Sequence, residues 1–120
     1  MSLSEIEKKA KEWSNDPFSK ETQEEVKELY KDKRLLEDCF YKDLEFGTGG
    51  MRGIMGVGTN RINKYTLGKN TQGICNYLNK TQNGEIKVAI AFDCRNNSDF
   101  FAKIVADVFS ANKIKAYIFS

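Results

Sequence analysis

The sequence predicts an α/β fold: a helical N-terminal lead, a glycine-rich β segment and then a βαβ unit of a mixed sheet. Three observations support this prediction. Apolar residues recur at helical spacing among the charged residues of segment 1–45. Six of the nine glycines fall within residues 47–58. After them, two apolar and partly β-branched runs, residues 86–93 and 114–120, flank a helical pattern, which is the order of elements in a βαβ unit.

Residues 1–45 are expected to form three helices that pack on a larger body. The spacing of Ser4 and Glu7 is that of a capping box, which predicts the start of the first helix there. The Asp16-Pro17 pair ends that pattern, and a second helix is predicted from about Lys20. The apolar residues expected to share one face in the three helices are Ile6, Ala10 and Trp13, then Val26, Leu29 and Tyr30, then Leu35, Leu36, Cys39 and Phe40.

The densest glycine cluster lies in EFGTGGMRGIMGVGTNRIN, residues 45–63. Glycine destabilises regular structure, so the cluster indicates tight turns or a close approach of the backbone to a ligand. Neither common nucleotide motif fits. A G-x-G-x-x-G that starts at Gly47 would need glycine where Arg52 stands, and the later G-K pair is followed by Asn70, which has no hydroxyl group for magnesium. Apolar residues interspersed with the glycines argue against disorder.

We therefore expect an extended or hairpin segment that bends around an anion, with main-chain N–H groups and the Arg52 guanidinium converging on it. Arginine suits phosphate because its planar fork donates hydrogen bonds in pairs. The alternative that the residues leave open is a plain β-hairpin on which Arg52 and Arg61 are merely exposed.

The rest of the chain supplies the βαβ unit and a helix before it. That helix is predicted over residues 66–80, followed by a turn at residues 82–84. The run IKVAIAFD, residues 86–93, is apolar enough for a strand buried on both faces of a sheet. Ser98 is the expected N-cap of the next helix, and residues 114–120 form the last strand. The residues expected to face inward are Leu67, Thr71, Ile74 and Leu78 on the first helix and Phe101, Val105, Val108 and Phe109 on the second.

Asp93 and Arg95, in AFDCRNNS, form a second candidate site. They follow the carboxyl end of the predicted buried strand, where open α/β sheets place their ligands. The helix that starts near Ser98 would also present an N-terminus that attracts anions. The alternative is structural: Asp93 pairs with Arg95 or caps the turn. The residues alone favour neither interpretation.

Composition excludes several classes of function. The chain has 40% hydrophobic and 30% charged residues, and no apolar run is long enough for a membrane span. Residues 1–45 hold 13 acidic and 9 basic residues, whereas residues 46–120 hold 4 and 10. The net positive charge of residues 46–120 suits anionic ligands, but their basic residues are too scattered for a nucleic-acid-binding surface. Because there is no histidine and Cys39, Cys75 and Cys94 are dispersed, we expect no metal site, free buried thiols and a reducing cytoplasmic location.

The segment LEFGTGGMRGIMGVGTNRIN closely resembles the N-terminal signature of the α-D-phosphohexomutases, in their phosphoglucomutase/phosphomannomutase branch. AFDCRNNSDFFA is similar to a G-x-D-x-R-x-x-S-x-x-F-A stretch of that family, and DPFSKET with the acidic helices looks like its helical lead. The resemblance covers essentially the whole chain. It implies that Arg52 contacts phosphate, with Thr48 in the same loop and Arg95 behind them. Gly49 and Met51 depart from the family pattern but leave Arg52 in place.

The resemblance also implies parts that this chain does not contain. Those enzymes have four domains, a phosphoserine in a T-A-S-H-N-P loop and a magnesium site in a D-G-D-x-D-R loop, and neither motif occurs here. Residues 1–45 are thus expected to be a helical lead, and residues 46–120 a part of domain I truncated before the phosphoserine loop, with no catalytic or metal-binding residue. The full-length parent is expected to interconvert hexose 1-phosphate and hexose 6-phosphate through a bisphosphorylated intermediate, with Mg²⁺ and an activator of the glucose 1,6-bisphosphate type.

Three other hypotheses about function stay open. The parent is a phosphopentomutase of the same family in the first, and a free-standing phosphate- or nucleotide-binding module in the second. In the third, the polypeptide itself is an inactive partial domain that self-associates through its last strand, where Ile114, Ile118 and Phe119 need cover. The residues do not distinguish glucose, mannose, glucosamine or pentose as the sugar, nor a native Met1-Ser2-Leu3 start from a cloning scar.

Overall fold

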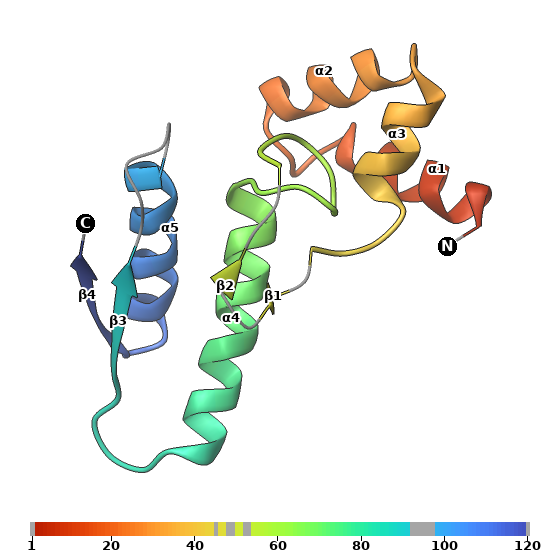
Figure 1. Ribbon diagram of the computed structural model, residues 1–120. Helices are drawn as coiled ribbons and strands as arrows, with labels where there is room; N and C mark the ends of the chain where they lie inside the picture. The colour runs from red at the N-terminus through yellow and green to blue at the C-terminus, as the bar shows by residue number, and fades with distance from the viewer. Residues whose placement is uncertain (1, 45, 48–49, 52–53, 92–97, 120) are drawn as a thin grey trace. The chain divides into compact units, whose positions relative to one another are not determined.

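The structure is a computed structural model of the 120-residue chain, and it describes residues 2–44, 46–47, 50–51, 54–91 and 98–119 (Figure 1). Helices and parallel strands together confirm the predicted α/β class. Contacts divide the chain into two compact units, Met1–Asn63 and Lys64–Ser120, which are described separately below. A division by compactness does not define a domain, so the boundary after residue 45 stays a prediction.

Three helices form the first part of unit 1: α1 Leu3–Trp13, α2 Lys20–Leu29 and α3 Lys33–Phe40. Each helix is preceded by a residue whose side chain accepts a hydrogen bond from a first-turn N–H, namely Ser2, Ser19 and Asp32. The capping box predicted at Ser4 and Glu7 is therefore wrong. An N-cap needs extended backbone, which Ser2 has (φ −73°, ψ 161°), and Ser4 already lies inside α1.

Aromatic rings join these helices into one core. Trp13 stacks on Phe18 with ring centroids 4.6 Å apart, and Phe40 meets it edge-on at 5.6 Å. The buried apolar side chains include most of those predicted: Ile6, Ala10, Trp13, Val26, Leu36, Cys39 and Phe40. Tyr30 and Leu35 are exposed instead, so their predicted inward placement is wrong. Tyr30 caps the end of α2, and the short α3 buries only a narrow stripe beside Leu35.

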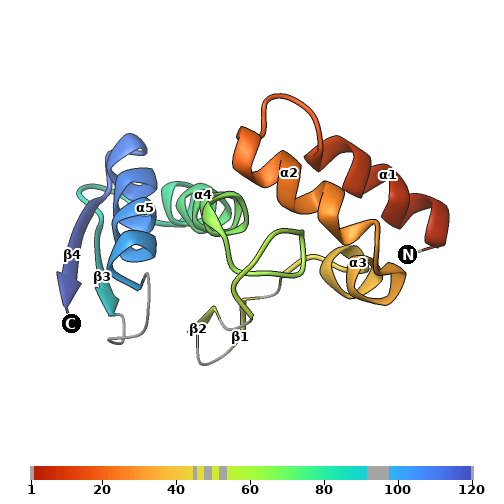
Figure 2. The same ribbon diagram turned by 90° about the horizontal axis from the view of Figure 1, so that it is seen from above.

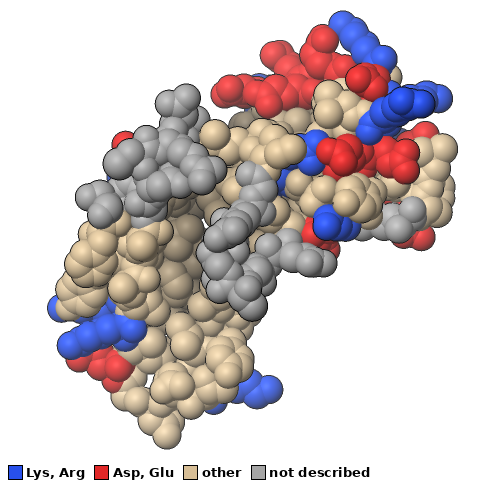
Figure 3. Space-filling view, in the orientation of Figure 1, with Lys and Arg blue, Asp and Glu red and all other residues tan. Residues whose placement is uncertain are grey.

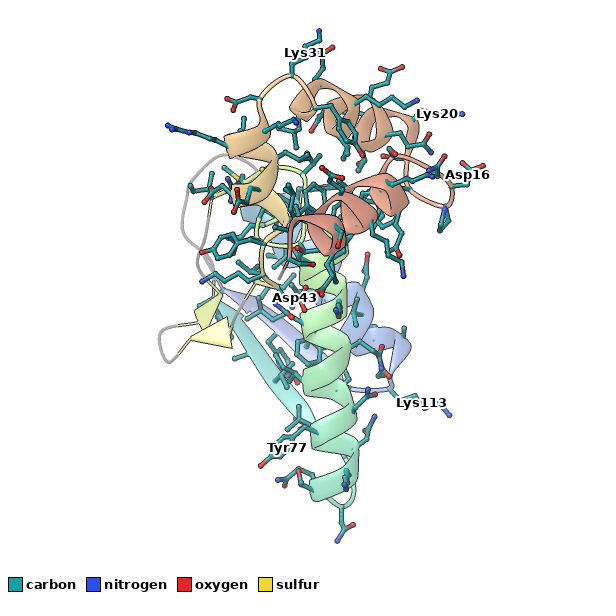
Figure 4. The ribbon with its side chains drawn as sticks, turned by 90° about the vertical axis from the view of Figure 1, so that its right-hand side faces the viewer. Asp16, Lys20, Lys31, Asp43, Tyr77 and Lys113 are labelled. Carbon is teal, nitrogen blue, oxygen red and sulfur yellow. The ribbon has the colours of Figure 1, made fainter. Side chains whose placement is uncertain are left out.

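Polar side chains are also buried in unit 1. Gln23 is buried on α2, and its Nε2 donates to the Phe18 carbonyl at 2.6 Å and to Asp16 Oδ1 at 3.2 Å. Because these bonds satisfy the buried amide, a polar side chain replaces an apolar one on the inner face without an unpaired group. Lys9 of α1 forms an ion pair with Asp43, which is labelled in Figure 4, with 3.8 Å between Lys9 Nζ and Asp43 Oδ1.

The glycine-rich segment contains two short strands, β1 Phe46–Gly47 and β2 Gly50–Met51. They pair antiparallel, with Phe46 opposite Met51 and Gly47 opposite Gly50. This pairing confirms the predicted extended or hairpin backbone. Beyond β2 the chain continues into residues 54–63, which we call the docked loop because they pack on the end of α3.

Unit 2 consists of α4 Lys64–Thr81, β3 Lys87–Ala91, α5 Ser98–Ala111 and β4 Lys115–Phe119. The two strands are parallel, in a register that runs from Lys87 opposite Lys115 to Ala91 opposite Phe119. Seen from above, α5 lies between the two-stranded sheet and α4 (Figure 2). The predicted strand–helix–strand unit is confirmed, with the helix packed on the sheet as a parallel crossover requires.

The core of unit 2 lies where α4, α5 and the sheet meet. Its fully buried members are Cys75, Phe109 and Ile114, and the partly buried side chains around them are Ile74, Leu78, Ile86, Val88, Ile90, Val105, Val108 and Ala116. The prediction that β3 is buried on both faces is wrong, because Lys87, Ala89 and Ala91 are exposed. Alanines at the outward positions made an alternating strand look continuously apolar.

A reciprocal pair of amides links α4 to the end of α5. Gln72 Nε2 donates to Asn112 Oδ1 at 3.0 Å, and Asn112 Nδ2 donates back to Gln72 Oε1 at 2.9 Å. Asn112 Nδ2 also donates to the Val108 carbonyl at 2.8 Å, which satisfies an acceptor in the last turn of α5. The pair therefore closes one end of the helix while it joins two helices.

In the residues that the structure describes, no helix is long and apolar enough to cross a membrane. The visible face of the three N-terminal helices carries many charges of both signs, whereas much of the visible face of unit 2 is uncharged (Figure 3).

Candidate functional site

The three residues predicted to bind phosphate, Arg52, Thr48 and Arg95, lie outside the described residues, and so does Asp93. Their roles stay predictions. The structure does describe both flanks of the segment that carries Arg52 and Thr48. The described part of the candidate site consists of the chain on either side of that segment: the end of α3 before it and the docked loop after it.

Backbone hydrogen bonds tie the docked loop to the chain just before the glycine-rich segment. The Leu44 N–H donates to the Thr59 carbonyl at 2.7 Å, and the Thr59 hydroxyl donates to the Lys42 carbonyl at 2.8 Å. The Asn60 N–H donates to the Cys39 carbonyl at 2.9 Å. The last of these bonds satisfies a carbonyl group that the end of α3 leaves without a helical partner.

Arg61 makes the strongest contacts between the loop and α3. Its Nη2 pairs with Asp38 Oδ2 at 2.5 Å, and its Nη1 donates to the carbonyls of Asp38 and Asn60 at 3.2 and 3.1 Å. Arg61 is only 6% exposed, whereas the side chain of Asp38 is 55% exposed. The interpretation of Arg61 as merely exposed is thus wrong: its charge is buried, paired and bonded to the backbone.

Inside the docked loop, the chain folds back on itself. The Ile62 N–H donates to the Ile54 carbonyl at 2.9 Å, and the Gly56 N–H donates to the Ile62 carbonyl at 3.1 Å. Asn63 Nδ2 adds hydrogen bonds to the carbonyls of Gly56 and Gly58 at 2.8 and 3.0 Å. The side chain of Asn63 thus satisfies two backbone carbonyl groups of the loop that no described strand pairs with.

Gly58 is where the loop touches α3 most closely. Its φ of +119° lies in the region that favours glycine, and a Cβ there would stand 2.4 Å from the Cys39 carbonyl oxygen. One of the six clustered glycines is therefore explained by close packing of backbone on backbone.

Cys39 lies beneath this contact and is 4% exposed. Burial raises the pKa of the Cys39 thiol, an effect that the nearby Arg61 charge opposes and Asp38 reinforces. Burial also raises the pKa of Cys75. Both are free thiols, which confirms the prediction that they are small buried residues, and Cys94 lies outside the described residues.

Shallow hollows occur on unit 1 among the residues that the structure describes. One, of about 660 Å³, lies over the end of α1 and the turn after it, from Lys8 to Phe18, and another, of about 270 Å³, lies over Arg34, Glu37, Asp38 and Tyr41. Both are open to solvent, so neither is enclosed as a small-molecule pocket is. Within the described ranges, no three Cys, Asp or Glu side chains gather as they would around a metal ion.

Sequence reasoning missed the group formed by Asp38, Asn60, Arg61 and Asn63. The signal was present: the end of the glycine-rich segment, GTNRIN, places an arginine between two asparagines, whose side chains commonly bond to backbone groups in loops. The partner Asp38 was not recognisable, because it lies on a charged helix among many exposed acidic residues.

Comparison with known proteins bears on what this segment does. The family described as "Phosphoglucomutase/phosphomannomutase, alpha/beta/alpha domain I" matches residues 43–120. That range begins just before the glycine-rich segment and includes the docked loop and all of unit 2.

Curated proteins match over most of the chain. A phosphopentomutase from Mus musculus is 38% identical over 119 residues, which cover 90% of this chain and 18% of that protein. A phosphopentomutase from Homo sapiens is 39% identical over 110 residues, covering 82% of this chain and 18% of the relative. A phosphoglucomutase from Staphylococcus aureus is 38% identical over 95 residues, covering 78% and 17%. The chain thus spans less than a fifth of the length of these relatives. No solved structure matches it.

Proposed function

Because the chain belongs to the phosphoglucomutase/phosphomannomutase family, with domain I matching residues 43–120, we propose that the full-length protein is a phosphosugar mutase. It interconverts a hexose 1-phosphate and a hexose 6-phosphate through a phosphoserine and a bisphosphorylated intermediate. The single observation that supports this best is the family match across the glycine-rich segment and unit 2. We propose that the protein acts in the cytoplasm, which free thiols at Cys39 and Cys75 suit.

In this proposal Arg52 contacts phosphate, with Thr48 beside it and Arg95 behind. Phosphoryl transfer passes through a highly charged transition state, so its catalysis depends on positioning and on fixed positive charge. A guanidinium on a glycine-rich segment with two anchored ends supplies such a charge. Arg61 does not compete for this role, because it is buried and already paired with Asp38.

A second candidate substrate has a specific observation in its favour. The mouse and human relatives, which match over most of the chain, are phosphopentomutases, while the Staphylococcus aureus relative is a phosphoglucomutase. Their identities to this chain differ by a single percentage point, so similarity does not separate a hexose from a pentose. The proposal therefore names the reaction class first and the hexose second.

The polypeptide of 120 residues alone is proposed to be inactive. Its sequence contains neither T-A-S-H-N-P nor D-G-D-x-D-R, and the described residues bring no acidic cluster together. Among the residues that the structure describes, no group thus fits a magnesium site. Mg²⁺ and a glucose 1,6-bisphosphate-type activator belong to the proposal for the full-length protein only.

The test is a coupled assay of the full-length protein with glucose 1-phosphate and, separately, with ribose 1-phosphate. We expect turnover, and we expect Arg52→Ala to lower kcat/KM by about 10²–10³-fold, the scale for loss of one transition-state donor. Arg34→Ala is the matched control, since Arg34 is exposed on α3. Near-normal kinetics in Arg52→Ala would remove Arg52 from the site, and absence of turnover with both sugars would favour a phosphate-binding module.

A further inference from the structure

Arg61 connects three parts of unit 1 from a buried position. One nitrogen pairs with the Asp38 carboxylate, and the other donates to the backbone carbonyls of Asp38 and Asn60. Asn60 Nδ2 donates to the same Asp38 carbonyl at 3.0 Å. Two adjacent side chains of the docked loop thus converge on one residue of α3. A methionine or lysine at position 61 could fill the space but could not make this set of bonds.

These contacts hold both ends of the glycine-rich segment. Leu44, the last described residue before it, bonds to Thr59, and Ile54, the first described residue after β2, bonds to Ile62. Thr59 and Ile62 lie close to Arg61 in the chain, within the docked loop. The entry and the exit of the segment are therefore attached to the same short loop, and Arg61 attaches that loop to α3 together with Asn60.

We propose that Arg61, paired with Asp38, is a positioning residue for the glycine-rich segment, and that it fixes where Arg52 stands when phosphate binds. The inference rests on the proposed function. Its physical basis is entropy: glycine loses more conformational freedom on folding than any other residue, so anchors at both ends of a glycine-rich segment lower the entropic cost of holding it in one conformation. Arg61 acts through the backbone and does not touch the phosphate itself.

The first arm of the test measures docking of the loop by thiol labelling of the 120-residue chain. Cys39 is the reporter, because Gly58 covers it so closely that a Cβ on Gly58 would lie 2.9 Å from Cys39 Cβ. With Cys94 replaced by serine, we expect Arg61→Met to raise the labelling rate of Cys39 at least tenfold. The rate at Cys75, buried in unit 2, should not change.

Two variants keep this arm interpretable. Arg34→Met makes the same substitution at an exposed position of α3 and should leave both thiols slow. Arg61→Lys restores the charge without the fork and should give an intermediate rate at Cys39. The fluorescence of Trp13, the chain's single tryptophan, shows that unit 1 stays folded in each variant. An unchanged Cys39 rate in folded Arg61→Met overturns the proposal.

The second arm measures kinetics in the full-length protein. A displaced segment misplaces Arg52, so we expect Arg61→Met to lower kcat/KM by about 10- to 100-fold, and Arg61→Lys to recover part of the loss. If Arg61→Met exposes Cys39 but leaves kcat/KM unchanged while Arg52→Ala lowers it, the positioning role is overturned and the proposed function stands. If Arg52→Ala also leaves kcat/KM unchanged, the role proposed for Arg52 fails, and positioning fails with it.

Discussion

Gly58→Ala should destabilise unit 1 more than any other single methyl group added in the docked loop. The new Cβ would lie 2.4 Å from the Cys39 carbonyl oxygen and 2.9 Å from Cys39 Cβ, closer than real Cβ atoms approach. That carbonyl accepts the Asn60 N–H at 2.9 Å, so moving it weakens a hydrogen bond that docks the loop. The φ of +119° adds backbone strain for any residue with a Cβ.

The magnitude follows from these two effects. Holding a residue other than glycine in a sparsely populated backbone region costs about 1–3 kcal/mol. Weakening the hydrogen bond to Cys39 costs about 0.5–1.5 kcal/mol. We therefore expect the free energy of unfolding of unit 1 to fall by about 2–4 kcal/mol. Gly56→Ala is the matched control, because its φ is also positive, but its Cβ would meet only the Arg61 side chain, at 3.8 Å.

Urea unfolding followed by Trp13 fluorescence measures this difference. Trp13 is the single tryptophan and packs on Phe18 and Phe40, so its emission reports on unit 1. The midpoint should fall further in Gly58→Ala than in Gly56→Ala, with the urea dependence unchanged in both. Equal losses in the two variants would refute the reasoning, because strain without a clash would then explain everything.

Three other expectations follow from the structure. Thr71 is fully buried, and its hydroxyl has no hydrogen-bond partner among the described residues, so Thr71→Val should leave the thermal stability of unit 2 equal or raise it by up to about 1–2 kcal/mol; a clear loss by calorimetry would show a hidden partner. Burial raises the pKa of Cys75 above its unfolded value, so its contribution is full below pH 9.0 and is lost as pH rises through the folded pKa. Urea titrations from pH 8 to 10 should show unit 2 losing up to about 1.4 kcal/mol per pH unit more than Cys75→Ala does, and identical slopes would contradict this. Finally, Tyr117, Ile118 and Phe119 are exposed on β4, which predicts self-association that light scattering detects and Phe119→Lys weakens, whereas Tyr77→Lys on α4 does not; a monomer at every concentration would be the opposite result.

The sequence predicts the elements of this fold well where their signals are local. Helical spacing around Ile6, Ala10 and Trp13 identifies α1, and two apolar runs with a helix between them identify the parallel pair. The predictions are wrong where the surrounding structure determines which residue caps a helix or which side chain is buried. Ser2 rather than Ser4 caps α1 because its backbone is extended, and Tyr30 is exposed because α2 ends before it.

For the candidate site, sequence patterns indicate the segment but not its support. The glycine cluster and Arg52 are recognisable in the sequence itself, and their roles stay predictions. The pairing of Arg61 with Asp38 joins positions 23 residues apart, and no local pattern encodes such a distance. Gly58 likewise has a reason that only the tertiary structure shows, the Cys39 backbone beneath it.

The reciprocal amides of Gln72 and Asn112 also constrain how this chain can diverge. Each side chain must present one nitrogen donor and one oxygen acceptor to the other, across 40 positions of sequence. An aspartate at position 112 would face the Gln72 oxygen with a carboxylate and lose the donor to Val108. Substitution at one site alone thus leaves its counterpart mismatched, whereas a paired exchange, such as a carboxylate for one amide and a lysine for the other, restores complementarity. In related sequences, substitutions at positions 72 and 112 should therefore be correlated.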